Sequence, residues 1–202
     1  RELHQHVIER GVGGLLVLVG LALPEAAARA AHVPVRQVVE QQFQRGHSPL
    51  GVEHVQRSAH VQRGLVEPGD EVLYPDPGFP TYEAMIRVAG GVPVPVPLVE
   101  ANDFSFDLDA FDRLISERTR LIILNSPCNP TGSVIPLRDL EHIAAAAQRY
   151  DCWVLSDEIY MRIVFDGQQA PSIATLPGMA GRTVIIDGFS KTYAMTGWRL
   201  GF

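Results

Sequence analysis

One side chain in the sequence is a candidate nucleophile. Lys191 is the only lysine in the chain, which has 16 arginines. It follows the apolar segment Val184–Ile186 and lies beside Ser190. A lysine that is not used as a general surface charge can serve as a reactive amine. Residue counts alone do not separate this chemistry from chance in an arginine-rich chain, so both interpretations stand at this point.

Two further polar segments follow apolar stretches in the same way. The segment Asn125–Gly132 (NSPCNPTG) follows Leu121–Leu124, and Ser156–Tyr160 (SDEIY) follows Trp153–Leu155. In open α/β sheets, ligands bind at the carboxyl ends of the strands. Three strand ends with polar, non-repeating residues therefore predict one shared pocket. Asn129–Gly132 can also be read as a simple turn, because every residue in it favours turns.

The elements that would position these residues alternate between strand and helix. This alternation predicts an α/β fold, with three layers (α/β/α) and a mostly parallel sheet. The Val-Pro alternation of one predicted strand, Val92–Val96, suits an edge or an irregular strand. The other predicted strands are Glu71–Tyr74, Leu121–Leu124, Trp153–Leu155 and Val184–Ile186, and the predicted helices are Tyr82–Ala89, Asp107–Arg118 and Leu137–Tyr150.

Composition restricts the classes of function. The hydrophobic fraction of 46% means that the chain can bury a core, and the formal net charge of −6 argues against nucleic-acid binding as its main function. Cys128 and Cys152 form no CxxC pattern, and we predict packing roles for them, no metal site and a cytoplasmic location. The apolar run Gly11–Leu23 is shorter than the roughly 20 residues of a membrane span. We interpret it as a buried segment, with a signal peptide as the alternative.

Taken together, the motifs identify a family resemblance. NSPCNPTG, SDEIY and FSKTYAMTGWRLG, with PDPGFPTY upstream, resemble the class I/II aminotransferases, which are fold type I pyridoxal-phosphate (PLP) enzymes. The resemblance runs from about Leu65 to Phe202. Asn129 precedes Asp157 by 28 positions and Lys191 precedes Arg199 by eight, both as in that family. The resemblance implies transfer of an amino group between an amino acid and a 2-oxo acid. It also implies a homodimer in the full-length parent protein.

The same resemblance assigns the two central roles. Lys191 would hold the PLP aldehyde as a Schiff base and then move a proton during the reaction. Asp157 would keep the pyridine nitrogen protonated, since an opposite charge nearby favours the charged form. Glu158 is the rival by chemistry alone, but in an extended segment its side chain should point to the other face. Asp157 and Glu158 can also be read as ordinary acids at a strand end.

The remaining roles concern the rest of the cofactor. By resemblance, Asn129 and Tyr160 donate hydrogen bonds to the phenolate oxygen and tune the imine pKa, which makes Tyr160 a catalytic candidate as well. Arg199 would bind the phosphate, and Ser190 would add a hydroxyl. Phe79 occupies the position whose ring stacks on the pyridine. Phe79 can also be read as a core aromatic, and for the nearby Tyr82 we prefer that interpretation.

The sequence departs from the family pattern in two places. Residues 1–64 contain six of the seven histidines and no Asp, Lys, Tyr or Trp, and Val35–Arg63 has no convincing phosphate-binding turn. We therefore divide the chain into an atypical segment, 1–64, and a partial PLP-binding large domain, 65–202. A wrong reading frame or a misjoined sequence would explain the first part, and resequencing the coding DNA tests this.

The second departure is the end of the chain just after Arg199. The family's small C-terminal domain and its substrate-binding arginine lie outside these 202 residues, so we do not expect the 202 residues to suffice for activity.

Two other functions remain open. The motifs hold the cofactor rather than the substrate, so a carbon–sulfur lyase on the same fold is the nearest alternative. The second alternative is a non-catalytic, aminotransferase-like domain of a transcription regulator. Its only support is a faint helix-turn-helix pattern in Ala27–Gln41, for which ordinary paired helices are the preferred interpretation. We predict small-molecule substrates and neither a nucleic-acid nor a membrane partner.

Overall fold

The computed structural model describes residues 61–198 and Gly201. In this part of the chain, six strands form one sheet in the order β3-β2-β1-β4-β5-β6. All neighbouring strands are parallel except β2 and β3. The predicted α/β fold with a mostly parallel sheet is confirmed. The strands are β1 (Glu71–Asp76), β2 (Val92–Val99), β3 (Ser105–Phe106), β4 (Thr119–Asn125), β5 (Trp153–Asp157) and β6 (Thr183–Ile186).

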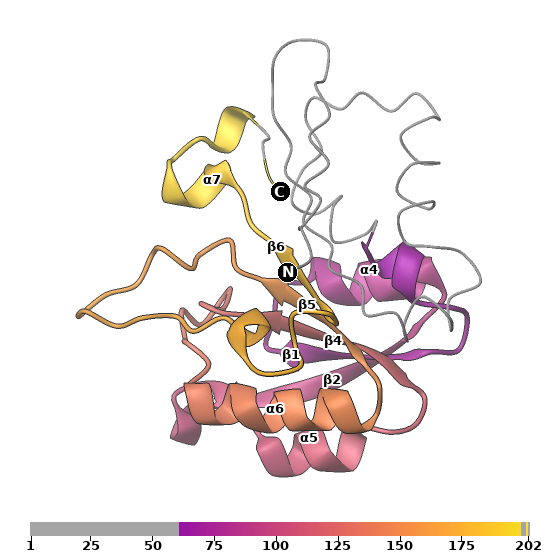
Figure 1. Cartoon of the computed structure of the whole chain (residues 1–202). Coiled ribbons are helices and arrows are strands. Elements are labelled where there is room, and N and C mark those ends of the chain that lie inside the picture. The colour runs from indigo at the N-terminus through magenta and orange to yellow at the C-terminus, as the bar shows by residue number, and fades with distance from the viewer. Residues whose placement is uncertain (1–60, 199–200, 202) are drawn as a thin grey trace, which may run out of the picture.

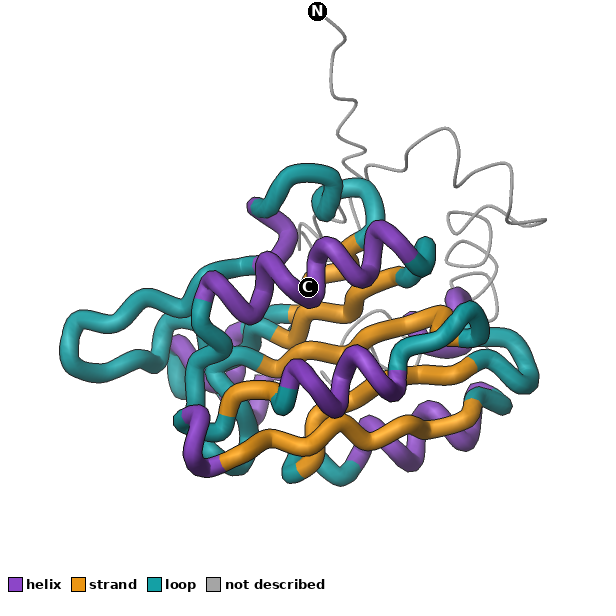
Figure 2. The backbone as a smooth tube through the Cα atoms, turned by 90° about the horizontal axis from the view of Figure 1, so that it is seen from below, coloured by secondary structure: helices purple, strands orange, loops and turns teal. Residues whose placement is uncertain are grey.

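Helices cover both faces of this sheet. They are α4 (Thr81–Ala89), α5 (Leu108–Leu114), α6 (Leu137–Arg149) and the short α7 (Phe189–Thr192). Helix α4 lies on one face, and α5 and α6 lie on the other (Figure 1). From below, α5 and α6 cross in front of the strands, which run side by side between them and α4 (Figure 2). The three predicted layers are therefore present.

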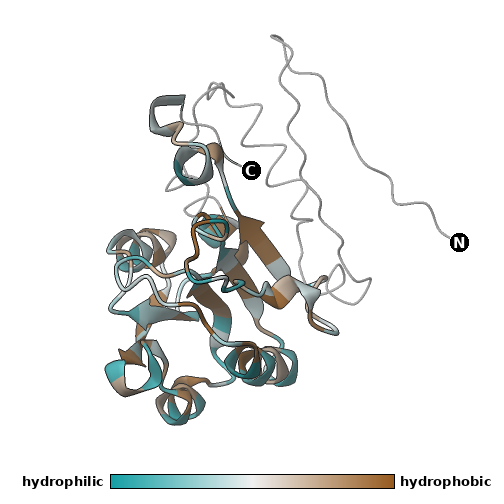
Figure 3. Ribbon diagram, turned by 90° about the vertical axis from the view of Figure 1, so that its left-hand side faces the viewer, coloured by the Kyte–Doolittle hydropathy of each residue, from teal (hydrophilic) through white to brown (hydrophobic). Residues whose placement is uncertain are grey.

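Alternate residues of each central strand enter two separate cores. In β4, Leu121 and Ile123 belong to the core under α4, whereas Ile122 and Leu124 belong to the core under α5 and α6. Because successive side chains of a strand point to opposite faces, a sheet covered on both faces needs an unbroken apolar run. The strands are accordingly hydrophobic, and the helices carry their hydrophilic residues outward (Figure 3).

The proline-containing strand is more regular than the sequence indicated. Strand β2 pairs with β1 along six positions and is second from the edge, and β3 is the outermost of the described strands. The Val92 amide donates to the Asp70 carbonyl, on the side of β1. Successive backbone nitrogens of a strand point to opposite sides, so the backbone nitrogens of Pro93, Pro95 and Pro97 point away from β1. The prolines thus remove no hydrogen bond from the β1–β2 pair.

The predicted helix Asp107–Arg118 is shorter in the structure. It begins as expected, because the Asp107 carboxylate caps α5 by accepting a hydrogen bond from the Ala110 amide at 2.9 Å. It ends at Leu114, after which Ile115 is extended. The Ser116 amide donates to the Thr119 hydroxyl oxygen at 2.9 Å, which forms a local turn into β4. This side-chain turn overrides the helical pattern of the last residues.

Several predictions fall outside the described residues. They concern the buried segment Gly11–Leu23, the paired helices of Ala27–Gln41, nearly all of the atypical segment 1–64, and Arg199. Within the part of the chain that the structure describes, no helix combines the length and the apolar character that a bilayer crossing requires.

Candidate active site

Four neighbouring strands bring the predicted site residues to one edge of the sheet. Strands β1, β4, β5 and β6 are parallel, so their carboxyl ends meet at the same edge. Phe79 follows β1, Asn129 follows β4, Asp157 ends β5, and Lys191 lies in α7 just after β6. Residues up to 112 positions apart in sequence thus share one side of the fold.

Asp157 is a buried carboxylate with two defined partners. It is 2% exposed. Its Oδ2 accepts a hydrogen bond from the Tyr82 hydroxyl at 2.6 Å, and its Oδ1 accepts one from the Ile159 amide at 3.2 Å. A buried negative charge is costly unless it is hydrogen-bonded, and these donors come from two different elements. The carboxyl group is therefore held by hydrogen bonds on both oxygens, on the α4 side of the sheet.

Glu158 points into different surroundings, as the alternation along the strand predicts. Its Oε1 accepts hydrogen bonds from the Ser156 hydroxyl at 2.9 Å and from the Ser172 hydroxyl at 2.6 Å. Ser172 directly precedes Ile173, which packs in the core under α5 and α6. The two adjacent acids thus lie on opposite faces of the sheet, and only Asp157 shares a face with Tyr82.

Lys191 and Tyr160 approach each other at the ends of β5 and β6. The Lys191 Nζ lies 5.4 Å from the centroid of the Tyr160 ring. A cation within about 6 Å of a ring centroid is attracted by the electrons of the ring. The side chain of Lys191 is exposed, and Ser190 beside it is half-buried. The amine is therefore accessible to a small molecule and close to the phenol.

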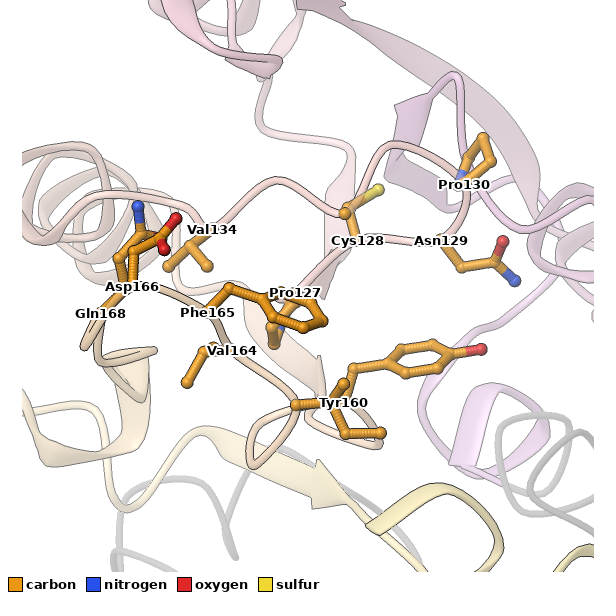
Figure 4. Close-up of a pocket in the computed structure, with 12 residues that line it drawn as sticks. Pro127, Cys128, Asn129, Pro130, Val134, Tyr160, Val164, Phe165, Asp166 and Gln168 are labelled. Atoms are coloured by element: carbon orange, nitrogen blue, oxygen red, sulfur yellow. The ribbon is translucent and has the colours of Figure 1, made fainter. Parts of the chain in front are cut away.

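Asn129 and Tyr160 border a pocket of about 330 Å³. The amide end of Asn129 and the hydroxyl end of Tyr160 point in the same direction (Figure 4). Asp157 and Lys191 do not line this pocket, which extends instead towards the loop that follows β5. The chemistry of the side chains, rather than this pocket, therefore defines the candidate site.

A buried amide that the sequence did not single out holds two of these loops together. Asn125 Oδ1 accepts a hydrogen bond from the Asn129 amide at 2.7 Å. Its Nδ2 donates to the Asp157 carbonyl at 3.2 Å. Asn125 thus connects the loop after β4 to the end of β5. The available signal was its position as the first polar residue after an apolar strand.

Tyr82 is a core aromatic, as we preferred from the sequence, but it also contacts the site. It is 2% exposed, and its ring packs edge-on against Phe79 with centroids 5.7 Å apart. Burial, followed by the charge of Asp157, raises the pKa of the Tyr82 phenol well above its ordinary value. The phenol therefore stays protonated and donates to the carboxylate. No local pattern indicates this contact, because the two residues are 75 positions apart.

The phosphate-binding prediction for Arg199 stays a prediction, because that residue lies outside the described part of the chain. Within residues 61–198, no group of three or more His, Cys, Asp or Glu side chains comes together as a potential metal site.

The fold and the site together define an α/β protein with a candidate ligand site at the carboxyl ends of its parallel strands, where a buried carboxylate ends β5 and a lysine follows the neighbouring strand β6. The chain belongs to the aminotransferase family: the profile described as aminotransferase class I and II matches residues 56–202. The match starts nine residues before Leu65, where the sequence motifs placed its beginning.

Known relatives agree with this assignment. The chain is 49% identical over 138 residues to an aspartate aminotransferase of Pyrococcus abyssi and 47% identical to aromatic-amino-acid aminotransferase 2 of Thermococcus litoralis. Each match covers 68% of this chain but 36% of the relative, so the chain spans about a third of the length of these relatives. The solved aromatic aminotransferase of Pyrococcus horikoshii is 36% identical, with a TM-score of 0.72 over 88% of this chain and 52% of that one.

The buried Glu158 gives a pH-dependent prediction. Burial raises the pKa of this carboxyl above its ordinary value and outweighs the Ser172 and Ser156 hydroxyls, while the charges of Asp187 and Asp157 raise it further. A carboxyl with a raised pKa binds its proton more tightly in the folded state. Its contribution to stability is therefore present at low pH and is lost as the pH rises from about 4.3 through the folded pKa.

We expect Glu158→Gln to remove this loss, because an amide cannot ionise and its oxygen can still accept the serine hydroxyls. Thermal unfolding of both proteins near pH 4 and pH 7 is the measurement. The midpoint of the variant relative to the wild type should rise between the two pH values. A difference that is constant, or that falls with pH, would contradict the raised pKa. The nearby Asp187 is paired with Arg162 at 2.9 Å and is present in both proteins.

Proposed function

We propose that the full-length protein is a PLP-dependent aminotransferase that moves an amino group between an amino acid and a 2-oxo acid. The observation that carries this proposal is the buried, hydrogen-bonded Asp157 on the strand next to the one that leads to Lys191. The donor set fits PLP: an anion for a protonated ring nitrogen, an amine for the aldehyde, and neutral donors for the ring oxygen. When bound, PLP supplies a ring that absorbs the electrons of a carbanion.

Each residue then has a task that its surroundings support. The exposed Lys191 amine can bind the cofactor carbonyl and, once free, can take a proton from the substrate and return it. Asp157 would stabilise a protonated ring nitrogen of the cofactor. Two hydrogen-bond donors fix the orientation of its carboxyl group for this task. Tyr160 and Asn129 donate hydrogen bonds from the same side, and Phe79 offers a ring face against the cofactor ring. Tyr160 also lies close enough to influence the amine of Lys191.

The finer parts of the proposal rest on the family resemblance. Arg199 would bind the cofactor phosphate with Ser190, and the substrates would be small amino acids and 2-oxo acids. We propose a homodimer and a cytoplasmic location, and the free, buried thiols of Cys128 and Cys152 are compatible with a reducing compartment. Light scattering of the full-length protein tests the dimer.

One experiment separates this function from its alternatives. The purified protein is loaded with PLP, and the absorption of the bound cofactor is recorded. It is then offered amino acids with and without a 2-oxo acid. Amino transfer that requires the 2-oxo acid is the expected result, whereas release of pyruvate and ammonia without it would indicate a carbon–sulfur lyase. Cofactor binding without turnover, together with DNA binding, would favour the regulator domain.

A further inference from the structure

The hydrogen bond between Tyr82 and Asp157 joins two elements that are distant in sequence. The Tyr82 hydroxyl on α4 donates to Oδ2 of Asp157 at the end of β5, at 2.6 Å and across 75 positions. Both side chains are buried. Hydrogen bonds to a charged acceptor are short and roughly twice as strong as those between neutral groups. This contact is therefore strong enough to determine how the carboxylate is oriented.

The second carboxylate oxygen is held from another direction. The Ile159 amide donates to Oδ1 at 3.2 Å, from the backbone that follows β5. One donor from α4 and one from the backbone leave the carboxyl group little freedom to rotate about its Cβ–Cγ bond. The backbone donor is present whatever residue occupies position 82. Tyr82 therefore contributes a side-chain hydrogen bond that a substitution at position 82 can remove.

The chemistry of Tyr82 permits this role at any working pH. Burial, the negative charge of Asp157 and the hydrogen bond itself raise the pKa of the phenol, and Cys128 and Tyr160 raise it further. The phenol thus remains a donor and never competes with Asp157 as an anion. Its ring is fixed in turn by the edge-on contact with Phe79, with planes 82° apart.

We propose that Tyr82 is a positioning residue whose hydroxyl holds the Asp157 carboxylate in the orientation that meets the ring nitrogen of the cofactor. This inference rests on the proposed function, because it needs a cofactor with a basic ring nitrogen. Tyr82 acts through Asp157 and is not required to touch the cofactor. Removing the hydroxyl should therefore weaken the binding only of those ligands that have a basic ring nitrogen.

The test compares two ligands on one variant. Tyr82→Phe keeps the ring and its packing and removes only the hydroxyl. The dissociation constants of PLP and of its analogue with a carbon in place of the ring nitrogen are measured on the cofactor-free protein. The dissociation constant of PLP should rise by about tenfold or more, the scale of a hydrogen bond to a charged group, and that of the analogue by less than about threefold. An equal change for both ligands would show a general structural role and overturn the proposal.

Tyr74→Phe is the matched control. Tyr74 is a partly buried tyrosine that packs against the same core as Tyr82, and its hydroxyl interacts with Glu83 rather than with Asp157. The ratio of the two dissociation constants should equal that of the wild type. If the dissociation constant of PLP, relative to that of the analogue, rose as much as in Tyr82→Phe, the effect would reflect loss of any hydroxyl from this core.

A second variant keeps the proposal testable if loss of the Tyr82 hydrogen bond unfolds Tyr82→Phe. The double variant Tyr82→Phe/Asp157→Asn has no charge at position 157 and is compared with Asp157→Asn alone. Both should give the same ratio of dissociation constants, and a further change would mean that Tyr82 contacts the ring directly, against the proposal. Failure of the wild type to bind PLP would instead reject the proposed function, so the two failures are distinguishable.

Discussion

Replacing Lys191 with alanine is expected to lower the rate of amino transfer by at least about 10³-fold, the upper range for loss of a group that moves a proton. It should also remove the covalent link to PLP, because Lys191 is the amine proposed to bind the cofactor and is the one lysine among these 202 residues. The readouts are kcat with a saturating 2-oxo acid and the mass of the protein after borohydride reduction. A mass increase equal to reduced PLP in the variant would exclude Lys191 as the bound amine.

Arg149→Ala is a suitable control for this variant. The Arg149 guanidinium lies 5.3 Å from the centroid of the Tyr150 ring, a contact of the same kind as that between Lys191 and Tyr160. It lies at the end of α6, on the opposite side of the sheet from α4. Its loss should leave kcat and the PLP adduct unchanged. The control thus separates loss of a cation–ring contact from loss of the reactive amine.

Asp157→Asn is expected to lower kcat/KM by roughly 10² to 10³-fold, the usual effect of removing a fixed electrostatic partner from an active site. The amide has the same shape and can still accept the Tyr82 hydroxyl, so the fold should be retained. The neutral amide cannot stabilise a protonated ring nitrogen of the cofactor, and the reaction should slow for that reason. Steady-state kinetics measures the loss, and cofactor content is determined on the same samples.

Glu158→Gln tests the specificity of that effect. It neutralises the adjacent buried carboxyl, but on the face of the sheet that carries Ser156 and Ser172. Its kcat/KM should stay within about threefold of the wild type, in the range of changes away from the reacting groups. If Glu158→Gln were the inactive variant and Asp157→Asn the active one, the two acids would have to exchange roles.

Strand periodicity and polar strand ends could be predicted because they depend on neighbours in sequence. The family resemblance selected Asp157, and side-chain alternation predicted that Glu158 points to the other face. The hydrogen bonds of the two residues agree with that alternation. The apolar runs of β4 and β5 likewise identified a sheet covered on both faces.

What could not be predicted depends on contacts between distant segments. The Tyr82 hydroxyl reaches Asp157 because α4 covers the face of the sheet to which Asp157 points, and no local pattern around either residue indicates this contact. The early end of α5 combines the local turn of Ser116 and Thr119 with a distant contact, in which the Ser116 hydroxyl donates to Glu71 in β1 at 2.6 Å. Such tertiary hydrogen bonds override local helical propensity, which spans less than about 1 kcal/mol per residue for ordinary residues.

The prolines of β2 have a consequence for association between molecules. Pro93, Pro95 and Pro97 occupy the positions whose amides would face away from β1, and proline has no N–H to donate. A strand from another copy that paired with this side of β2 would find carbonyl oxygens as acceptors. It would find no N–H donors at the proline positions, so only part of the usual hydrogen bonds between strands could form. We therefore expect the sequence VPVPVP to disfavour pairing of another copy along this side of β2.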